Sequence, residues 1–289
     1  MPVRSLIRSL AVALVASCIA GAPATAAPSG APALRATYEK LAPEMASGPF
    51  GRPMVLKSVE TESTLKGEVY GVLDYPLAKV GTSLDKPTRW CEMLMLHLNN
   101  RGCRADDGKK TLTLSVVRRY DIPVEEAFQL TFQLRVNAAT PEHFEAKLTS
   151  GKGPFGTSNY LISVEAIPIE NGKSFIHFSY AYEQSSATRV ATKSYLGTFG
   201  RGKVGFTVVG KESNGEPKLQ DGMLGLVERN AMRYFLALDA YLAAPDDLEK
   251  RLKLWYAATQ KYPRQLDDAS EADYLKHKRM DRAPQGKTK

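Results

Sequence analysis

Apolar and polar residues alternate along five segments in the middle of the chain, which is the pattern of a β-strand with one buried face. Turn residues separate these segments, so together they predict an antiparallel meander. Their apolar positions are Leu112, Leu114 and Val116, then Phe132, Leu134 and Val136, then Phe144, Ala146 and Leu148, then Tyr160, Ile162, Val164 and Ala166, and last Ile176, Phe178, Tyr180 and Tyr182. One earlier strand is predicted over residues 68–73.

Helical spacing appears on both sides of this meander. Residues 76–84 and 88–98 predict two short helices, separated by Lys86-Pro87. After the meander, residues 187–199 favour a helix and residues 204–209 a strand. Asn214-Gly215 is a strong signal for a tight turn.

The clearest helix covers residues 223–242, and Pro245 ends it. Its apolar side chains recur at spacings of three and four, which is typical of an amphipathic helix: Leu224, Val227, Ala231, Tyr234, Phe235, Leu238 and Leu242. Residues 246–262 and 269–280 predict two further helices. The chain is therefore expected to have an α+β fold.

The domain organisation follows from these elements. One folded domain is expected over residues 50–244, followed by a helical extension over 245–289 that ends in a basic tail. Residues 27–49 are expected to form a linker and a short helix, because residues 22–36 are rich in Ala and Pro and a helical pattern begins near Tyr38.

The first 26 residues resemble a secretory signal. Arg4 and Arg8 precede an apolar run, and Ala24-Thr25-Ala26 supplies the small residues that signal peptidase reads. The run is too short to cross about 30 Å of hydrocarbon. We expect a soluble protein of the periplasm. The alternative is a lipoprotein anchored at Cys18, because the residues before it resemble a lipobox.

Two cysteines remain in the body of the chain, Cys91 and Cys103. In an oxidising compartment they are expected to form a disulfide, which would contribute roughly 3 kcal/mol. Two reduced thiols are the alternative. A metal site is disfavoured, because no further cysteine would complete it.

The net charge of +8 is modest, and its densest part is the tail from Lys276 to Lys289. Such a tail would suit an anionic membrane surface, or it is an ordinary solvated surface. Nucleic acid is a poor match for an exported chain without an aromatic and basic binding motif.

The order of strand, two helices, meander and long helix resembles the helix-grip fold of the START-like (SRPBCC, polyketide-cyclase-like) superfamily, of which this chain would be an exported bacterial member. The local match is best from Val69 to Trp90, where a strand passes into DYPLAKVGTSLDKPTRW, and residues 223–242 match the closing helix. The resemblance covers residues 54–243. The segment 187–219 and the chain after Pro245 depart from it.

The resemblance implies a curved sheet that grips a helix and leaves a space for a sterol, phospholipid or other apolar molecule. Either the candidate residues line this space or they fill an ordinary core, and alternation cannot distinguish the two. Several tyrosine hydroxyls that need partners favour a partly polar pocket. The candidates are Trp90, Phe132, Phe144, Tyr160, Phe178, Tyr180, Tyr182, Tyr234 and Leu238.

Catalytic motifs are absent from the sequence, so no catalytic residue, cofactor or metal ligand is assigned. His143 and Glu145 are the one pair placed to share a face, and His97 is expected on a helix. Glu228 and Arg229 are expected either on a solvated helix face or at a ligand head group.

The leading hypothesis is a non-enzymatic periplasmic binding or carrier protein for a lipid or other apolar molecule, held in a continuous cavity beneath residues 223–242. One alternative is a cyclase-type or hydrolase-type enzyme on the same scaffold, which would need titratable groups converging in the cavity. The other is an envelope interaction protein with a filled core. The sequence does not indicate an oligomeric state.

Overall fold

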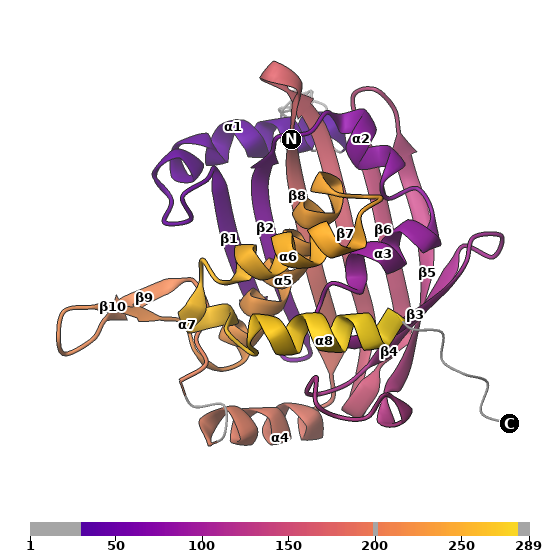
Figure 1. Ribbon diagram of the computed structural model, residues 1–289. Coiled ribbons are helices and arrows are strands. Elements are labelled where there is room, and N and C mark those ends of the chain that lie inside the picture. Colours follow the sequence, from indigo (N-terminus) through magenta and orange to yellow (C-terminus); the bar gives the residue numbers. More distant parts are fainter. Residues whose placement is uncertain (1–29, 199–201, 283–289) are drawn as a thin grey trace, which may run out of the picture.

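A large antiparallel sheet forms the centre of the protein (Figure 1). The computed structural model describes residues 30–198 and 202–282, and within them eight strands pair in the order β1-β2-β8-β7-β6-β5-β4-β3. The strands are β1 (Met54–Glu60), β2 (Thr64–Leu73), β3 (Asn100–Asp106), β4 (Thr111–Val116), β5 (Phe128–Ala139), β6 (Phe144–Lys152), β7 (Thr157–Ile169) and β8 (Lys173–Gln184).

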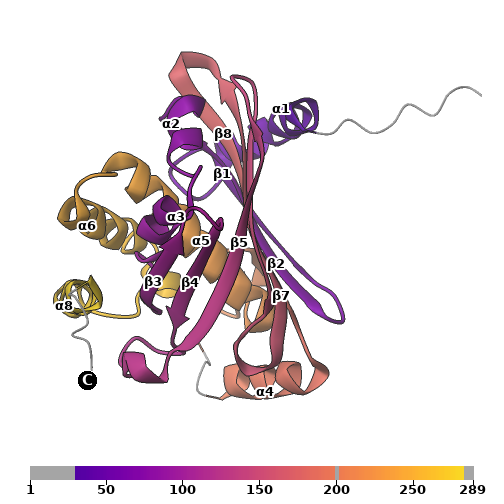
Figure 2. The same cartoon turned by 90° about the vertical axis from the view of Figure 1, so that its right-hand side faces the viewer.

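Helices cover the sheet on both faces. They are α1 (Ala31–Ser47), α2 (Leu77–Thr82), α3 (Pro87–Leu94), α4 (Ser186–Gly197), α5 (Gly222–Ala243), α6 (Leu248–Thr259), α7 (Pro263–Leu266) and α8 (Glu271–Arg282). Helix α5 packs against β1, β2 and β8, and we call the face of the sheet toward it the inner face. In Figure 2 the sheet bends so that β3 and β4 come forward beside α5. The predicted α+β helix-grip arrangement is confirmed.

Glycine lets the sheet and α5 approach closely. A Cβ atom added to Gly67 of β2 would lie 2.7 Å from the carbonyl oxygen of Val227 and 2.9 Å from the Cβ atom of Ala231. Both of these residues belong to α5. Gly67 pairs with Tyr180 in the next strand, so this close contact lies beside that tyrosine.

Helix α1 lies on the opposite, outer face of the sheet (Figure 2). Leu34, Leu41 and Met45 pack there on Val55 and Phe175, in a small core of their own. The expectation of a linker up to residue 36 is therefore wrong for residues 31–36, which form the first turns of α1. Leu34 in this stretch is buried. Burial of its side chain stabilises the first turns of the helix, which the Ala-rich and Pro-rich composition did not indicate.

The C-terminal helices complete the same core. Trp255 of α6 donates a hydrogen bond from Nε1 to the carbonyl oxygen of Arg233 at 3.0 Å. Tyr274 of α8 donates one to the carbonyl oxygen of Leu96 at 3.0 Å. Both aromatic side chains belong to the main core cluster. The extension after Pro245 is thus packed over α5 and is not a separate appendage.

The segment between α4 and α5 contains a small ribbon. The strand expected over residues 204–209 begins only at Val208, where β9 (Val208–Lys211) pairs with β10 (Pro217–Leu219). The predicted turn at Asn214-Gly215 is confirmed, with Gly215 at a φ angle of +86°. The residues before β9 extend along α5 instead.

The predicted disulfide between Cys91 and Cys103 is present, with the two Cα atoms 5.5 Å apart. It joins α3 to β3, and it therefore fixes the helix that carries Trp90 to the edge of the sheet.

Among the described residues, no helix combines the length and the apolar character that a membrane span requires. The signal expected over residues 1–26, Cys18 and the last part of the basic tail lie outside the described residues.

Candidate functional site

The nine residues predicted to line a ligand space come together on the inner side of the sheet. They reach this place from α3, from β5 to β8 and from α5, and all nine belong to one core cluster. Alternation along each strand turns their side chains toward α5. That they contact a ligand stays a prediction.

The packing around these nine residues is uneven. Trp90, Phe132, Phe144, Phe178 and Leu238 retain at most 1% of their surface, so they are sealed. Tyr160, Tyr180, Tyr182 and Tyr234 retain 7–8% each. The sequence predicts a continuous cavity under residues 223–242, but the packing there is not open throughout. Phe235, Leu238 and Leu242 of α5 have no exposed surface either. Accessible surface is retained at the four tyrosines, which we call the tyrosine cluster.

The rings of the tyrosine cluster touch in sequence. Tyr160 and Tyr182 stack with their centroids 5.2 Å apart and their planes inclined by 15°. Tyr180 lies 5.8 Å from Tyr182 and 5.4 Å from Tyr234, measured between ring centroids. The cluster therefore joins β7 and β8 to α5 through aromatic contacts.

The hydroxyl groups of the cluster differ in their partners. The Tyr160 hydroxyl pairs with Thr157 Oγ1 at 2.9 Å. The Tyr234 hydroxyl accepts a long hydrogen bond of 3.5 Å from Asn100 Nδ2. No hydrogen bond joins the hydroxyl of Tyr180 or Tyr182 to any residue in the described ranges. Neither oxygen is among the buried polar atoms without a partner, so both hydroxyls keep some access to solvent.

Burial keeps these hydroxyls protonated. It raises the pKa of Tyr234 to about 12, and it raises the pKa of Tyr180 well above its ordinary value. Burial also raises the pKa of Tyr182, and neighbouring Tyr160 adds to the shift. The cluster therefore consists of neutral O–H groups that can donate hydrogen bonds at physiological pH.

His97 adjoins the cluster, with its ring centroid 4.8 Å from that of Tyr234. Its Nδ1 accepts a hydrogen bond from the backbone N–H of Asn99 at 3.1 Å. Burial lowers the pKa of His97 to about 3, so the ring is neutral with its proton on Nε2. The expectation that His97 lies on a helix is wrong, because α3 ends at Leu94.

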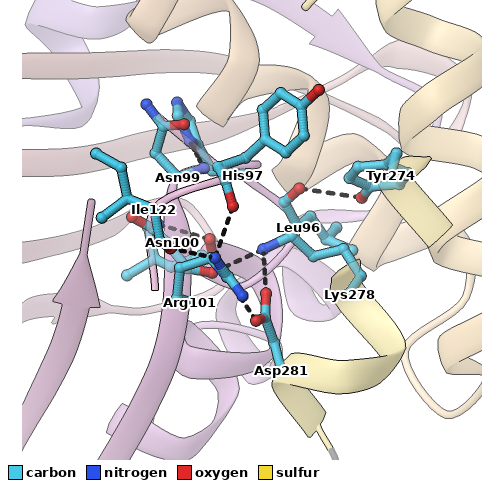
Figure 3. Close-up of polar contacts among 11 residues, drawn as sticks. Leu96, His97, Asn99, Asn100, Arg101, Ile122, Tyr274, Lys278 and Asp281 are labelled. Carbon is cyan, nitrogen blue, oxygen red and sulfur yellow. Dashed lines mark hydrogen bonds and ion pairs between the residues drawn. The ribbon is translucent and has the colours of Figure 1, made fainter. Parts of the chain in front are cut away.

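Figure 3 shows a buried charged network around Asn100. The side chain of Asn100 links this network to the tyrosine cluster through its hydrogen bond to Tyr234. Lys278 of α8 donates to the carbonyl oxygen of Asn100 at 2.7 Å and to Asp281 at 3.2 Å. Arg101 donates to the other oxygen of Asp281 at 2.6 Å. Burial lowers the pKa of Lys278 to about 8. These groups bind one another, so their role is to fasten α8 to β3 beneath Asn100.

The predicted pair of His143 and Glu145 does not form. His143 Nε2 contacts Glu165 Oε1 at 2.9 Å, and Glu145 pairs with Lys147. The adjoining residues Phe144 and Ala146 belong to the core, so Glu145 projects from the outer face, away from the tyrosine cluster.

A second histidine extends this outer cluster. His177 contacts Glu68 Oε1 at 2.8 Å and lies 3.9 Å from Glu165 Oε2. Burial alone would raise the pKa of Glu68, but hydrogen bonds from His177 and Lys66 outweigh it and lower the value to about 2. Among the described residues, no group of three His, Cys, Asp or Glu side chains is placed to hold a metal ion.

The polar side of α5 is buried and not solvated as the sequence suggested. Glu228 has no exposed surface, and its carboxylate accepts from Ser58 Oγ at 2.7 Å and from the backbone N–H of Phe206 at 2.6 Å. Thr207 donates to it through its N–H and its hydroxyl. The same carboxylate therefore has no free acceptor for a ligand head group, and it fixes the segment before β9 to the helix.

A surface hollow of about 460 Å³ lies between α4 and the start of α5. Leu196 of α4 and Met223 of α5 line it, and both also belong to the core cluster that contains the tyrosines. Glu60 and Lys193 lie at its rim. None of the nine predicted residues lines the hollow.

No protein-family model matches the chain, and no curated protein sequence matches it.

Several solved structures resemble the chain weakly. Ara h 8.0201 is 11% identical with a TM-score of 0.34, and the match covers 63% of this chain and 99% of that one. A point mutant of norcoclaurine synthase from Thalictrum flavum, in complex with a transition-state analogue, is 12% identical with a TM-score of 0.35, covering 49% and 91%. CalU16 from Micromonospora echinospora is 10% identical with a TM-score of 0.33, covering 71% and 96%. At these scores the similarity carries no argument about ligand, reaction or descent.

Proposed function

We propose that this protein is a non-enzymatic binding or carrier protein of the periplasm, which holds an apolar small molecule or lipid between the inner face of the sheet and α5. The observation that carries the proposal is the pair of hydroxyls on Tyr180 and Tyr182. They have accessible surface within an aromatic core and no hydrogen-bond partner among the described residues.

Phenylalanine would fill the same positions without an unpaired polar group. A packed core that only needed volume would therefore have no use for these hydroxyls. Their retained surface also indicates that the rings do not pack completely against their neighbours. Both observations fit a site that a partly polar ligand completes.

The hollow between α4 and α5 is the proposed entrance. Two of its lining residues, Leu196 and Met223, also belong to the core cluster that contains Tyr182 and Tyr234. Helix α4 is held across this end of the sheet by Arg189, which forms an ion pair with Glu60 and donates to the carbonyl oxygen of Glu62 at 2.6 Å. Separation of this helix from β1 would open the path.

The non-enzymatic part of the proposal rests on the absence of a suitable acid–base pair at the cluster. His143 and Glu145, the pair that would have supported a hydrolase or cyclase, point away from it. Among the described residues, the cluster is adjoined by its own protonated tyrosines and by neutral His97. The charged groups that act on it, Glu60 and Arg233, are held in ion pairs with Arg189 and Asp268. Location in the periplasm rests on the signal-like residues 1–26 and fits the Cys91–Cys103 disulfide.

Native mass spectrometry of the protein purified from the periplasm tests the proposal directly. We expect a stoichiometric adduct of lipid or small-molecule size, released by organic extraction, on a chain whose mass includes one disulfide. A protein that carries no adduct and does not enhance the fluorescence of N-phenyl-1-naphthylamine would contradict it.

One observation favours the interaction protein as a second candidate. The β9–β10 ribbon projects from the body (Figure 1), and Val208 and Val209 are 56% and 49% exposed on it. In that case the same spectrum would contain a protein-sized partner, and replacing both valines with serine would remove it.

A further inference from the structure

Helix α4 buries very little of its apolar surface. Figures 1 and 2 show it lying across one end of the sheet. Among its described side chains only Leu196 is buried, whereas Val190 is 69% exposed and Tyr195 is 53% exposed. A helix that belongs to a core normally turns its apolar face inward. Apolar burial therefore holds α4 in place only near its C-terminal end.

Charged side chains supply the rest of the attachment. Arg189 lies seven positions before Leu196, which places both on the same face of the helix. Arg189 forms an ion pair with Glu60 at the end of β1 and donates to the carbonyl oxygen of Glu62 at 2.6 Å. Lys193, one turn further along, lies 3.4 Å from the same Glu60 carboxylate. We call Glu60, Arg189 and Lys193 the clasp.

The clasp is open to water and ions. The side chains of Glu60 and Arg189 keep 19% and 23% of their surface, and Lys193 keeps more. Partly exposed ion pairs stabilise weakly, and salt screens them. Helices α6 and α8, by contrast, bury Trp255 and Tyr274 in the core. The hold of α4 on the body is therefore weaker than that of α6 or α8.

The beginning of α4 is fixed to the turn Pro154–Gly156. The backbone N–H of Ser185 donates to the carbonyl oxygen of Gly156 at 3.2 Å. The hydroxyl of Ser185 accepts from the backbone N–H of Thr188 at 3.2 Å and so caps the helix. The clasp and Leu196 can therefore separate from the body while the first turn of α4 keeps its contacts.

Movement of α4 would widen the hollow between α4 and α5. Glu60, Lys193 and Leu196 line this hollow, with Met223 of α5 among the other lining residues. Burial, Tyr160 and then Glu60 raise the pKa of Tyr182, so the Glu60 carboxylate lies near the tyrosine cluster. The clasp thus borders the hollow and acts on a residue of the cluster.

We propose that α4 is a lid over the hollow, which turns about Ser185 and is held closed by the clasp. The lid opens while the sheet and α5 stay folded, and a weaker clasp increases the fraction of open molecules. This inference deepens the proposed function, on which it rests for the role of the hollow as an entrance. The movement itself is measured without a ligand.

Amide hydrogen exchange of the mature protein, followed by mass spectrometry, tests the movement. Peptides from α4 are compared with peptides from α5 in the wild type and in the variants Glu60→Gln and Arg189→Gln. Asp239→Asn is the matched control. Asp239 forms an ion pair with Arg52 before the start of β1, and each of these side chains keeps 26% of its surface.

We expect α4 to exchange through an opening that leaves α5 protected. Each clasp variant should accelerate the exchange of α4 about fivefold, since a partly exposed ion pair corresponds to about that factor. The control should match the wild type. Added sodium chloride should accelerate α4 in the wild type and in the control, but much less in Glu60→Gln, where the charge of the clasp is gone.

Three results would overturn the lid. One is equal protection of α4 and α5 in the wild type. Another is exchange of α4 that neither clasp variant accelerates beyond the control. The third is equal acceleration of α4 and α5, because the clasp would then stabilise the whole fold and not a separate lid.

Binding kinetics of N-phenyl-1-naphthylamine separate the lid from the proposed function. If the lid controls entry, Glu60→Gln should bind and release the probe about fivefold faster than the wild type with little change in affinity, because opening affects entry and exit alike. Unchanged rates in Glu60→Gln would overturn the control of entry by the lid while the proposed function stands. A protein whose α4 opens as expected, but which binds no probe and carries no adduct, would keep the movement and lose the proposed function.

Discussion

The ring of Tyr180 in β8 lies 5.4 Å from the ring of Tyr234 in α5, measured between centroids. This contact connects the centre of the sheet to the helix at the point where sealed packing gives way to accessible surface. Phe235, Leu238 and Leu242 of the same helix have no exposed surface, whereas each of the four tyrosines keeps 7–8%. The relationship between these two tyrosines therefore marks the boundary of the proposed site.

The Tyr180→Phe variant is expected to keep the stability of the ligand-free protein within about 0.5 kcal/mol, because no hydrogen bond to protein is lost. Tyr160→Phe is the matched comparison and should lose about 1 kcal/mol, since the Tyr160 hydroxyl pairs with Thr157. Urea unfolding followed by tryptophan fluorescence measures both. Equal losses would mean that the Tyr180 hydroxyl has a partner within the protein.

The close approach of α5 to β2 predicts a large effect of Gly67→Ala. The added methyl group would lie 2.7 Å from a backbone carbonyl oxygen, so the helix must move, and we expect a loss of about 2 kcal/mol. Gly151→Ala in β6 is the control, because nothing lies within 4 Å of its added Cβ atom. The midpoints of urea unfolding compare the two variants. A Gly67→Ala protein as stable as the control would contradict the tight contact with Val227.

The outer cluster predicts a stability that depends on pH. The pKa of Glu68 is lowered from 4.5 to about 2, so its contribution is present above pH 4.5 and is lost as the pH falls toward 2. Burial alone would lower the pKa of His177, but the carboxylates of Glu165 and Glu68 outweigh it and raise the value above 6.5. The contribution of His177 to the stability is therefore full below pH 6.5 and is lost as the pH rises through the raised pKa.

We therefore expect the urea midpoint to be highest between these limits and to fall on both sides. Glu68→Gln should flatten the acid side of the profile, and His177→Gln should flatten the alkaline side. Lys109, which is an exposed partner of Asp106, provides a neutral control in Lys109→Gln. A profile that these two substitutions leave unchanged would exclude the cluster as its source.

The packing of the C-terminal helices predicts the outcome of truncation. A chain that ends at Pro245 loses Trp255 and Tyr274 from the core, so it should unfold or aggregate. A chain that ends at Arg282 keeps those contacts and should retain its unfolding midpoint. Binding of the chain ending at Arg282 to vesicles of anionic lipid, compared with the full chain, then tests whether the basic tail contacts an anionic membrane surface, without disturbing the fold. Normal folding of the chain ending at Pro245 would contradict this account.

Local periodicity was sufficient to predict the elements that carry the site. The spacing of Leu224, Val227 and Tyr234 gives the helix, and the alternation of Phe178, Tyr180 and Tyr182 gives the strand face that it covers. Each of these patterns depends only on near neighbours in the chain, so it can be detected without the fold.

The features that escaped prediction depend on distant partners. Glu228 has the sequence context of a solvated helix residue, but Thr207 and Ser58 surround it from other elements. Strand β3 has no apolar alternation, and it owes part of its support to Lys278. The aromatic residues differ in how much surface they keep exposed, and this difference depends on the detailed packing of neighbouring side chains. The alternation of apolar and polar residues cannot specify such detail.

The contact between Lys278 and Asn100 joins residues 178 positions apart, and the helix that makes it is the last one in the described chain. The core therefore cannot close until almost the whole chain is available. For a polypeptide that crosses a membrane in an extended state, as we propose, this order delays compaction until translocation is nearly complete. The C-terminal helix would thus complete the folding of the protein only after it has crossed the membrane.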